Sequence, residues 1–137
     1  MRWDDVLKAS ATAAAADPDL AAIYGEAVRL KATAQDHTVP GLLLWLVTDT
    51  AGELWEPVTI QWDQWTEDFQ ELVDSERALR KMFDKDNMVT IGGVTMFTVF
   101  TDGESLVDDP DRAGFYGRGL RFRMSPIRED LRCGRST

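Results

Sequence analysis

Acidic residues between positions 100 and 115 are the first candidates for chemistry. Asp108, Asp109 and Asp111 flank Pro110 in one short segment, and hard cations such as Ca²⁺ and Mg²⁺ are bound by several oxygen ligands. The segment lacks the central glycine and the terminal glutamate of a calcium-binding loop. We therefore interpret it as a solvated loop, and a cation-dependent hydrolase remains only an alternative interpretation of the sequence.

Other residue types that perform catalysis are isolated in the sequence. His37 and Cys133 are the only histidine and the only cysteine, so one chain cannot supply a cluster of nitrogen and sulfur metal ligands. Ser105 is not surrounded by a nucleophile-elbow motif, and there is no glycine-rich phosphate loop. We expect a protein without enzyme activity, metal ion or cofactor.

The charge of the chain excludes some partners and suggests another. The 137 residues include 15 Lys and Arg against 24 Asp and Glu, a net charge of −9, which argues against nonspecific binding to duplex DNA. Residues 1–111 carry 22 acidic and 8 basic side chains, whereas residues 112–137 carry 2 acidic side chains and 7 arginines. The acidic part of one copy could therefore face the arginines of another. The alternative is that the arginines pair within the chain or face water.

Apolar segments are too short to cross a bilayer. The longest run, residues 42–47, is far below the length of a membrane-spanning helix. The first residues contain no apolar stretch typical of a secretion signal. We expect a cytosolic product that does not contact membranes.

Local signals predict the elements that must position these residues. An alanine-rich helix is predicted over residues 3–16, followed by Asp17 as N-cap of a short helix over residues 18–24. The amphipathic pattern of residues 67–83 predicts one long helix with Thr66 as its N-cap. Gly92 and Gly93 predict a two-residue hairpin turn. Strands are expected at residues 27–31, 42–50, 53–64, 88–91, 94–101 and 115–124, with a long solvated loop at residues 102–114.

These elements define the expected fold. Hairpin connections favour an α+β domain over residues 1–124, with a mainly antiparallel sheet of about four to five strands. One long helix packs on this sheet beside an N-terminal helix, and residues 125–137 form an arginine-rich, flexible tail. Both faces of the strand over residues 42–50 are apolar, so a helix or another subunit must cover the second face.

Three segments resemble a known family. They are residues 16–25 (Ala-Asp-Pro-Asp-Leu-Ala-Ala-Ile-Tyr-Gly), residues 58–66 (Val-Thr-Ile-Gln-Trp-Asp-Gln-Trp-Thr) and residues 114–123 (Gly-Phe-Tyr-Gly-Arg-Gly-Leu-Arg-Phe-Arg). With the order of elements, they make residues 3–124 similar to the tail terminator proteins of long-tailed bacteriophages, also called tail completion or minor tail proteins. The resemblance implies an α+β fold and a ring, typically a hexamer, on the end of a finished tail tube.

Function and partners follow from this resemblance. The ring would stop growth of the tube and provide the surface that joins the head. Its partners would be copies of itself, the tail tube protein and the head–tail connector or stopper, while genomic DNA passes through the channel without specific binding. The protein would be made in the host cytoplasm and reside in the tail or neck of the virion. The alternative is a head–tail connector or stopper protein of the same neck.

Side-chain types indicate candidate interface residues. Tryptophan and arginine are enriched at binding hot spots, and Trp62 is expected in the core because it alternates with other apolar residues. Expected to meet a neighbouring subunit or the tail are Trp45, Trp55, Arg118, Arg121 and Arg123. Expected to line the channel or a docking loop, where negative charge would repel DNA, are Asp102, Glu104, Asp108, Asp109 and Asp111.

Overall fold

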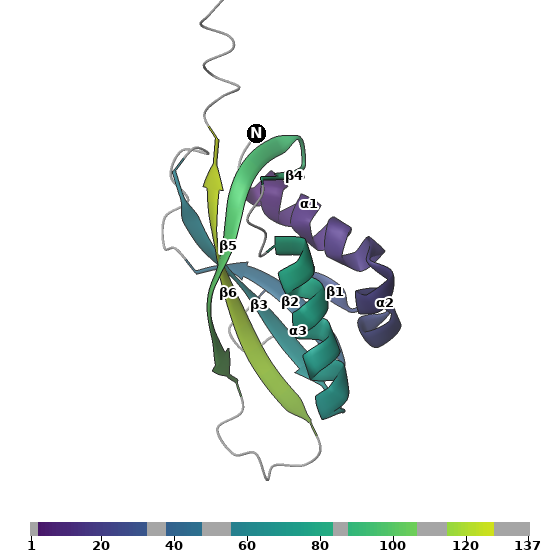
Figure 1. The fold of residues 1–137 in the computed structure, drawn as a ribbon. Coiled ribbons are helices and arrows are strands. Elements are labelled where there is room, and N and C mark those ends of the chain that lie inside the picture. Colours follow the sequence, from purple (N-terminus) through teal and green to yellow (C-terminus); the bar gives the residue numbers. More distant parts are fainter. Residues whose placement is uncertain (1–2, 33–37, 48–55, 84–87, 107–114, 128–137) are drawn as a thin grey trace, which may run out of the picture.

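A computed structural model describes residues 3–32, 38–47, 56–83, 88–106 and 115–127. The strands in these residues form one sheet, and the helices lie on one side of it (Figure 1). Along the chain they are α1 (Trp3–Ala16), α2 (Pro18–Tyr24), β1 (Val28–Leu30), β2 (Gly41–Leu46), β3 (Val58–Thr66), α3 (Phe69–Phe83), β4 (Val89–Ile91), β5 (Val94–Ser105) and β6 (Tyr116–Pro126).

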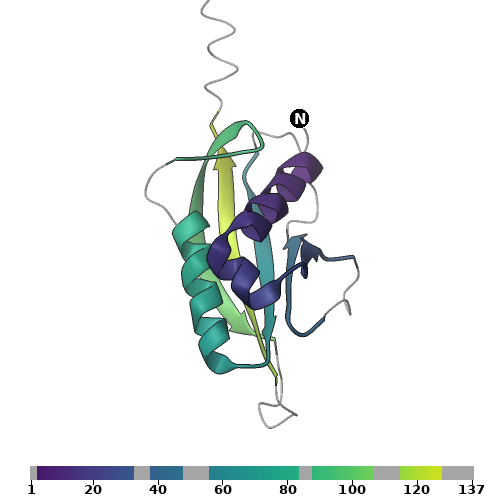
Figure 2. The same ribbon diagram turned by 90° about the vertical axis from the view of Figure 1, so that its right-hand side faces the viewer.

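The predicted fold class is wrong. The protein has a mixed sheet of six strands in the order β1-β2-β3-β6-β5-β4, curled into a half-barrel, and three helices (Figures 1 and 2). It is not a four- to five-stranded sheet under one long helix. Most neighbouring strands are antiparallel, but β1 is parallel to β2. Hairpin signals cannot reveal a parallel pair, because it arises from a crossover rather than from a tight turn.

The first two helices have the predicted bounds. The Asp17 side chain accepts hydrogen bonds from the backbone N–H groups of Asp19 and Leu20, which confirms it as the N-cap of α2. Gly25 ends that helix with a φ of 58°, a conformation that glycine adopts without steric cost. Capping and composition act within one helical turn, so these elements could be located from local sequence.

The start of α3 differs from the prediction. Thr66 is the last residue of β3, and its hydroxyl donates to the carbonyl oxygen of Asp68. Asp68 instead accepts a hydrogen bond from the backbone N–H of Gln70, as an N-capping side chain does. Phe69, an apolar residue within the segment predicted to form this amphipathic helix, is 59% exposed. The strand therefore runs further than expected and delays the helix by two residues.

The core lies between the helices and one face of the sheet. Trp62 is fully buried, as predicted, and its ring packs 5.6 Å from that of Phe83 at the end of α3. Phe83 also contacts Phe122 on β6 in an edge-on geometry. Figure 2 shows α1, α2 and α3 side by side over this face. None of the helices in the described residues covers the opposite face of the sheet.

The long hairpin of β5 and β6 extends beyond the predicted bounds. Residues 102–105, expected in a loop, belong to β5. The register slips between Phe100 and Asp102, so that Phe100 lies opposite Phe122 and Asp102 lies opposite Arg121. Thr101 is the extra residue of this β-bulge, and its hydroxyl donates to the backbone oxygen of Arg121. Because a bulge inserts one residue, it turns the following side chains to the other face of the sheet.

Candidate functional site

A buried carboxylate lies on the sheet face that the helices leave uncovered. Asp63 on β3 is 1% exposed, and its Oδ2 lies 2.7 Å from Nζ of Lys31. Its Oδ1 accepts hydrogen bonds from Gln61 Nε2 at 2.6 Å and from Trp45 Nε1 at 3.1 Å. Lys31 also lies over the Trp45 ring, 5.0 Å from its centroid. Both carboxylate oxygens are thus engaged by donors, and the group is closed to a substrate.

This polar cluster continues across the sheet through an arginine. Arg121 Nε on β6 donates to Gln61 Oε1 at 2.8 Å. Arg121 Nη2 lies 3.1 Å from Glu104 Oε1, and Nη1 lies 3.8 Å from Asp102 Oδ2. The connected side chains therefore link the segment after β1 to β5. We call this set the polar cluster: Lys31, Trp45, Gln61, Asp63, Asp102, Glu104 and Arg121.

Glycine at position 119 makes room for the polar cluster. A Cβ at Gly119 would lie 2.9 Å from Cδ of Gln61, which is closer than ordinary van der Waals contact. The Gln61 side chain can therefore lie flat across β6 and reach both Asp63 and Arg121. This close approach is a steric reason for glycine, since the position requires no unusual backbone conformation.

The second predicted arginine also pairs within the chain. Arg118 Nε on β6 lies 2.5 Å from Oε1 of Glu76 on α3, with the two side chains 38% and 27% exposed. Arg118 and Arg121 are therefore paired within one subunit, which was the alternative left open by the sequence. Arg123, by contrast, is exposed and has no ion-pair partner among the described residues.

The remaining predicted site residues divide into two groups. Trp45, expected at an interface, is half-buried and belongs to the polar cluster. Asp102 and Glu104 are exposed on β5, beside Arg121. Outside the described residues lie Trp55, Asp108, Asp109 and Asp111. Sequence reasoning missed Asp63 and Lys31, because neither belongs to a motif and their pairing depends on which strands become neighbours.

Large exposed apolar side chains gather at two places. On β5, Phe97 is 47% exposed and Val99 is 52% exposed. Val99 lies opposite Arg123 on β6, and Met88, 52% exposed, directly precedes Val89, which pairs with Met96. We call this surface the β5 patch: Met88, Phe97, Val99 and Arg123.

The second apolar surface lies where α3 begins. The rings of Phe69 and Tyr116 meet edge-on with centroids 5.8 Å apart, and Tyr116 is 41% exposed. Glu67 and Asp68 are exposed directly before Phe69. A groove of about 230 Å³ adjoins the two rings and continues to Leu72 and Arg118. We call this surface the α3 patch: Glu67, Asp68, Phe69 and Tyr116.

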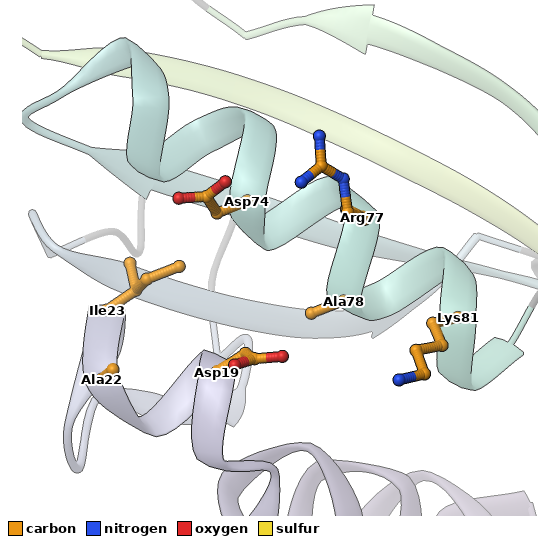
Figure 3. A pocket seen from close by; sticks show the side chains of 7 residues that line it. All are labelled: Asp19, Ala22, Ile23, Asp74, Arg77, Ala78 and Lys81. Atoms are coloured by element: carbon orange, nitrogen blue, oxygen red, sulfur yellow. The ribbon is translucent and has the colours of Figure 1, made fainter.

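A groove of mixed charge separates α2 from α3 (Figure 3). It measures about 370 Å³, and its walls carry Asp19 and Ile23 from α2 and Asp74, Arg77 and Lys81 from α3. Acidic and basic side chains are mixed along it, so the groove has no single charge that would select a ligand. Asp74 accepts a hydrogen bond from Gln70 at 3.0 Å.

Tyr24 is a buried titratable group outside the polar cluster. The Tyr24 hydroxyl on α2 lies 2.5 Å from the Ser75 hydroxyl on α3. Burial raises the pKa of Tyr24 well above its ordinary value, although the hydrogen bond with Ser75 lowers it and the charge of Glu71 raises it further. Among the described residues, no three acidic, histidine or cysteine side chains form a group that could hold a metal ion.

Comparisons with other proteins identify no relative. No protein-family model, no curated protein and no solved structure matches the chain. In the described part of the chain, no helix has both the length and the apolar character needed to cross a membrane.

Proposed function

We propose that this protein is a structural subunit of the virion of a long-tailed bacteriophage, a tail terminator that assembles into a ring. The ring would cap the tail tube, stop its growth and provide the surface to which the head connector joins. The three sequence segments that resemble this family support the proposal. Two of them coincide largely with β3 and β6, the adjacent central strands of the sheet.

The observation that carries the proposal is the pair of exposed apolar patches. Monomeric proteins rarely expose clustered large apolar side chains, and such patches mark contacts with other proteins. The β5 patch and the α3 patch together contain all five of the large apolar side chains found exposed among the described residues. A domain that presents two such surfaces is suited to contacts on two sides, as a subunit within a ring requires.

Charged side chains favour an assembly role over catalysis. A catalytic site normally combines a pocket with polar groups free to meet a substrate. In the polar cluster, Asp63 is closed to solvent, while Asp102 and Glu104 lie beside Arg121. The net charge of −9 would also disfavour binding of DNA that passes through the ring.

Electron microscopy of particles lacking the protein tests this proposal. The gene is deleted from the phage or prophage genome that carries it, and a plasmid copy serves as the control. Overlong tail tubes without heads are expected, because nothing would stop tube growth. Tails of normal length with unattached heads would instead indicate a connector or stopper. Complete particles with normal tails would refute a role in the neck.

A further inference from the structure

We propose that the β5 patch of one copy binds the α3 patch of the next copy, so that subunits associate head to tail. This inference rests on the proposed function in one respect: that the row of associated subunits closes into a ring. The contact itself follows from the positions, exposure and charge of the two patches. Each patch thus binds another copy of this chain.

The two patches lie at opposite ends of the β5–β6 hairpin. Tyr116 and Arg123 are seven positions apart on β6, which is roughly 23 Å at the rise of a β-strand. In Figure 1, β6 starts beside the lower end of α3 and runs up toward the end of the sheet that carries β4. A single contact between two copies can therefore use one patch from each and leave the other two patches free.

The patches also face opposite sides of the sheet. Phe97 and Val99 alternate with the buried residues Met96 and Thr98, so they point away from the helices. Phe69 belongs to α3, which covers the other face, and contacts Tyr116 from that side. A contact between the two patches is consequently heterologous, and repeating it produces either a closed ring or an open filament.

The charges favour contact between a β5 patch and an α3 patch over contact between two copies of the same patch. The β5 patch carries the cation Arg123, which is exposed and has no ion-pair partner among the described residues. The α3 patch carries the anions Glu67 and Asp68. Arg118, which lines the adjoining groove, is paired with Glu76. Two β5 patches would place arginine near arginine, whereas a β5 patch against an α3 patch brings opposite charges together.

Shape supports the same pairing. The α3 patch borders a groove whose lining includes Leu72, Phe115 and Gly117. The β5 patch presents Phe97 and Val99 as neighbours on the surface of a strand. Aromatic side chains that enter a pocket of the partner are the typical hot spots of an interface. We infer that Phe97 supplies this side chain and that the groove beside Phe69 receives it.

Two variants that each remove one patch provide the test. Phe97→Thr combined with Val99→Thr removes apolar surface from the β5 patch and keeps residues that favour strands. Phe69→Asp disrupts the α3 patch with a residue that the first turn of a helix accepts. Circular dichroism and thermal melting check that both variants fold. Lys81→Glu, at an exposed position of α3 outside both patches, is the control for a surface charge change.

Mixing the two variants distinguishes this contact from others. Native mass spectrometry and sedimentation over a concentration series should show wild-type oligomers larger than dimers. Each patch variant should weaken self-association by about 30-fold or more, whereas Lys81→Glu should not. An equimolar mixture of the two variants should form a one-to-one dimer that grows no further, because only one intact contact remains.

A charge exchange adds a second criterion. Arg123→Glu should weaken association, and mixing it with Glu67→Lys should restore part of the loss.

Wild-type protein that is monomeric at every concentration would overturn the inference, as would patch variants that associate like wild type or a mixture that stays monomeric. Overlong tubes after gene deletion together with unaffected patch variants would refute this contact and leave the proposed function standing. Patch variants that lose association, together with tails of normal length after gene deletion, would refute the proposed function and leave the contact standing.

Discussion

Replacing Asp63 by alanine should destabilise the fold strongly. The change removes a carboxylate that accepts hydrogen bonds from Lys31, Gln61 and Trp45. Removing one partner of a buried ion pair typically costs about 3–5 kcal/mol, because the other charge remains buried. The Lys31 side chain is 17% exposed, so it can regain part of its hydration, and we expect the lower limit, about 3 kcal/mol.

Thermal and urea denaturation measure this loss. For a domain of this size, about 3 kcal/mol corresponds to a fall in Tm of roughly 10 °C. The matched control is Asp102→Ala, whose carboxylate is 57% exposed and 3.8 Å from Arg121. Because exposed ion pairs contribute little, the control should lie within about 0.5 kcal/mol of wild type.

A double-mutant cycle separates the ion pair from general damage. Lys31→Met should destabilise wild type but cost much less once Asp63 is absent, since the charge it removes has lost its partner. An Asp63→Ala protein as stable as the Asp102→Ala control would refute our account of the polar cluster. Equal costs of Lys31→Met in both backgrounds would refute the ion pair as its main component.

Three further predictions concern positions outside this ion pair. Gly119→Ala should cost about 1–3 kcal/mol, because its Cβ would displace Gln61 and overpacking strains neighbours; urea melts that coincide with wild type would contradict the steric argument. Asp17→Ala should lower stability by about 1 kcal/mol through loss of the α2 N-cap, and Asp17→Asn, which can still accept the same hydrogen bonds, should retain most of it. Above about pH 10, where a tyrosine of ordinary pKa ionises, unfolded Tyr24 loses its proton while burial raises the pKa of the folded residue, so the folded protein should lose stability as pH rises. Tyr24→Phe should show a smaller loss over this range in denaturant melts, and parallel curves for the two proteins would argue against this linkage.

Sequence patterns located the elements whose determinants are local. The bounds of α1 and α2 are those predicted, and Gly92 and Gly93 form the turn between β4 and β5 with φ of 59° and 82°. Trp62 is buried as its alternation with apolar neighbours indicated. Propensity, capping and turn chemistry act over a few residues, so their effects can be inferred without knowing which strands become neighbours.

Tertiary structure decided the sheet and the surroundings of its charges. Parallel pairing of β1 with β2 follows no hairpin signal, and the bulge at Thr101 determines that Asp102 faces Arg121. Gln61 and Arg121 are 60 residues apart in the chain, and Lys31 and Asp63 are 32 apart. Contacts at such separations depend on strand order and register, which arise from packing of the whole chain. The sequence alone therefore indicated that arginines and acidic residues could pair. The strand order and register of the folded sheet determined which of them do, and left Arg123 exposed beside apolar residues.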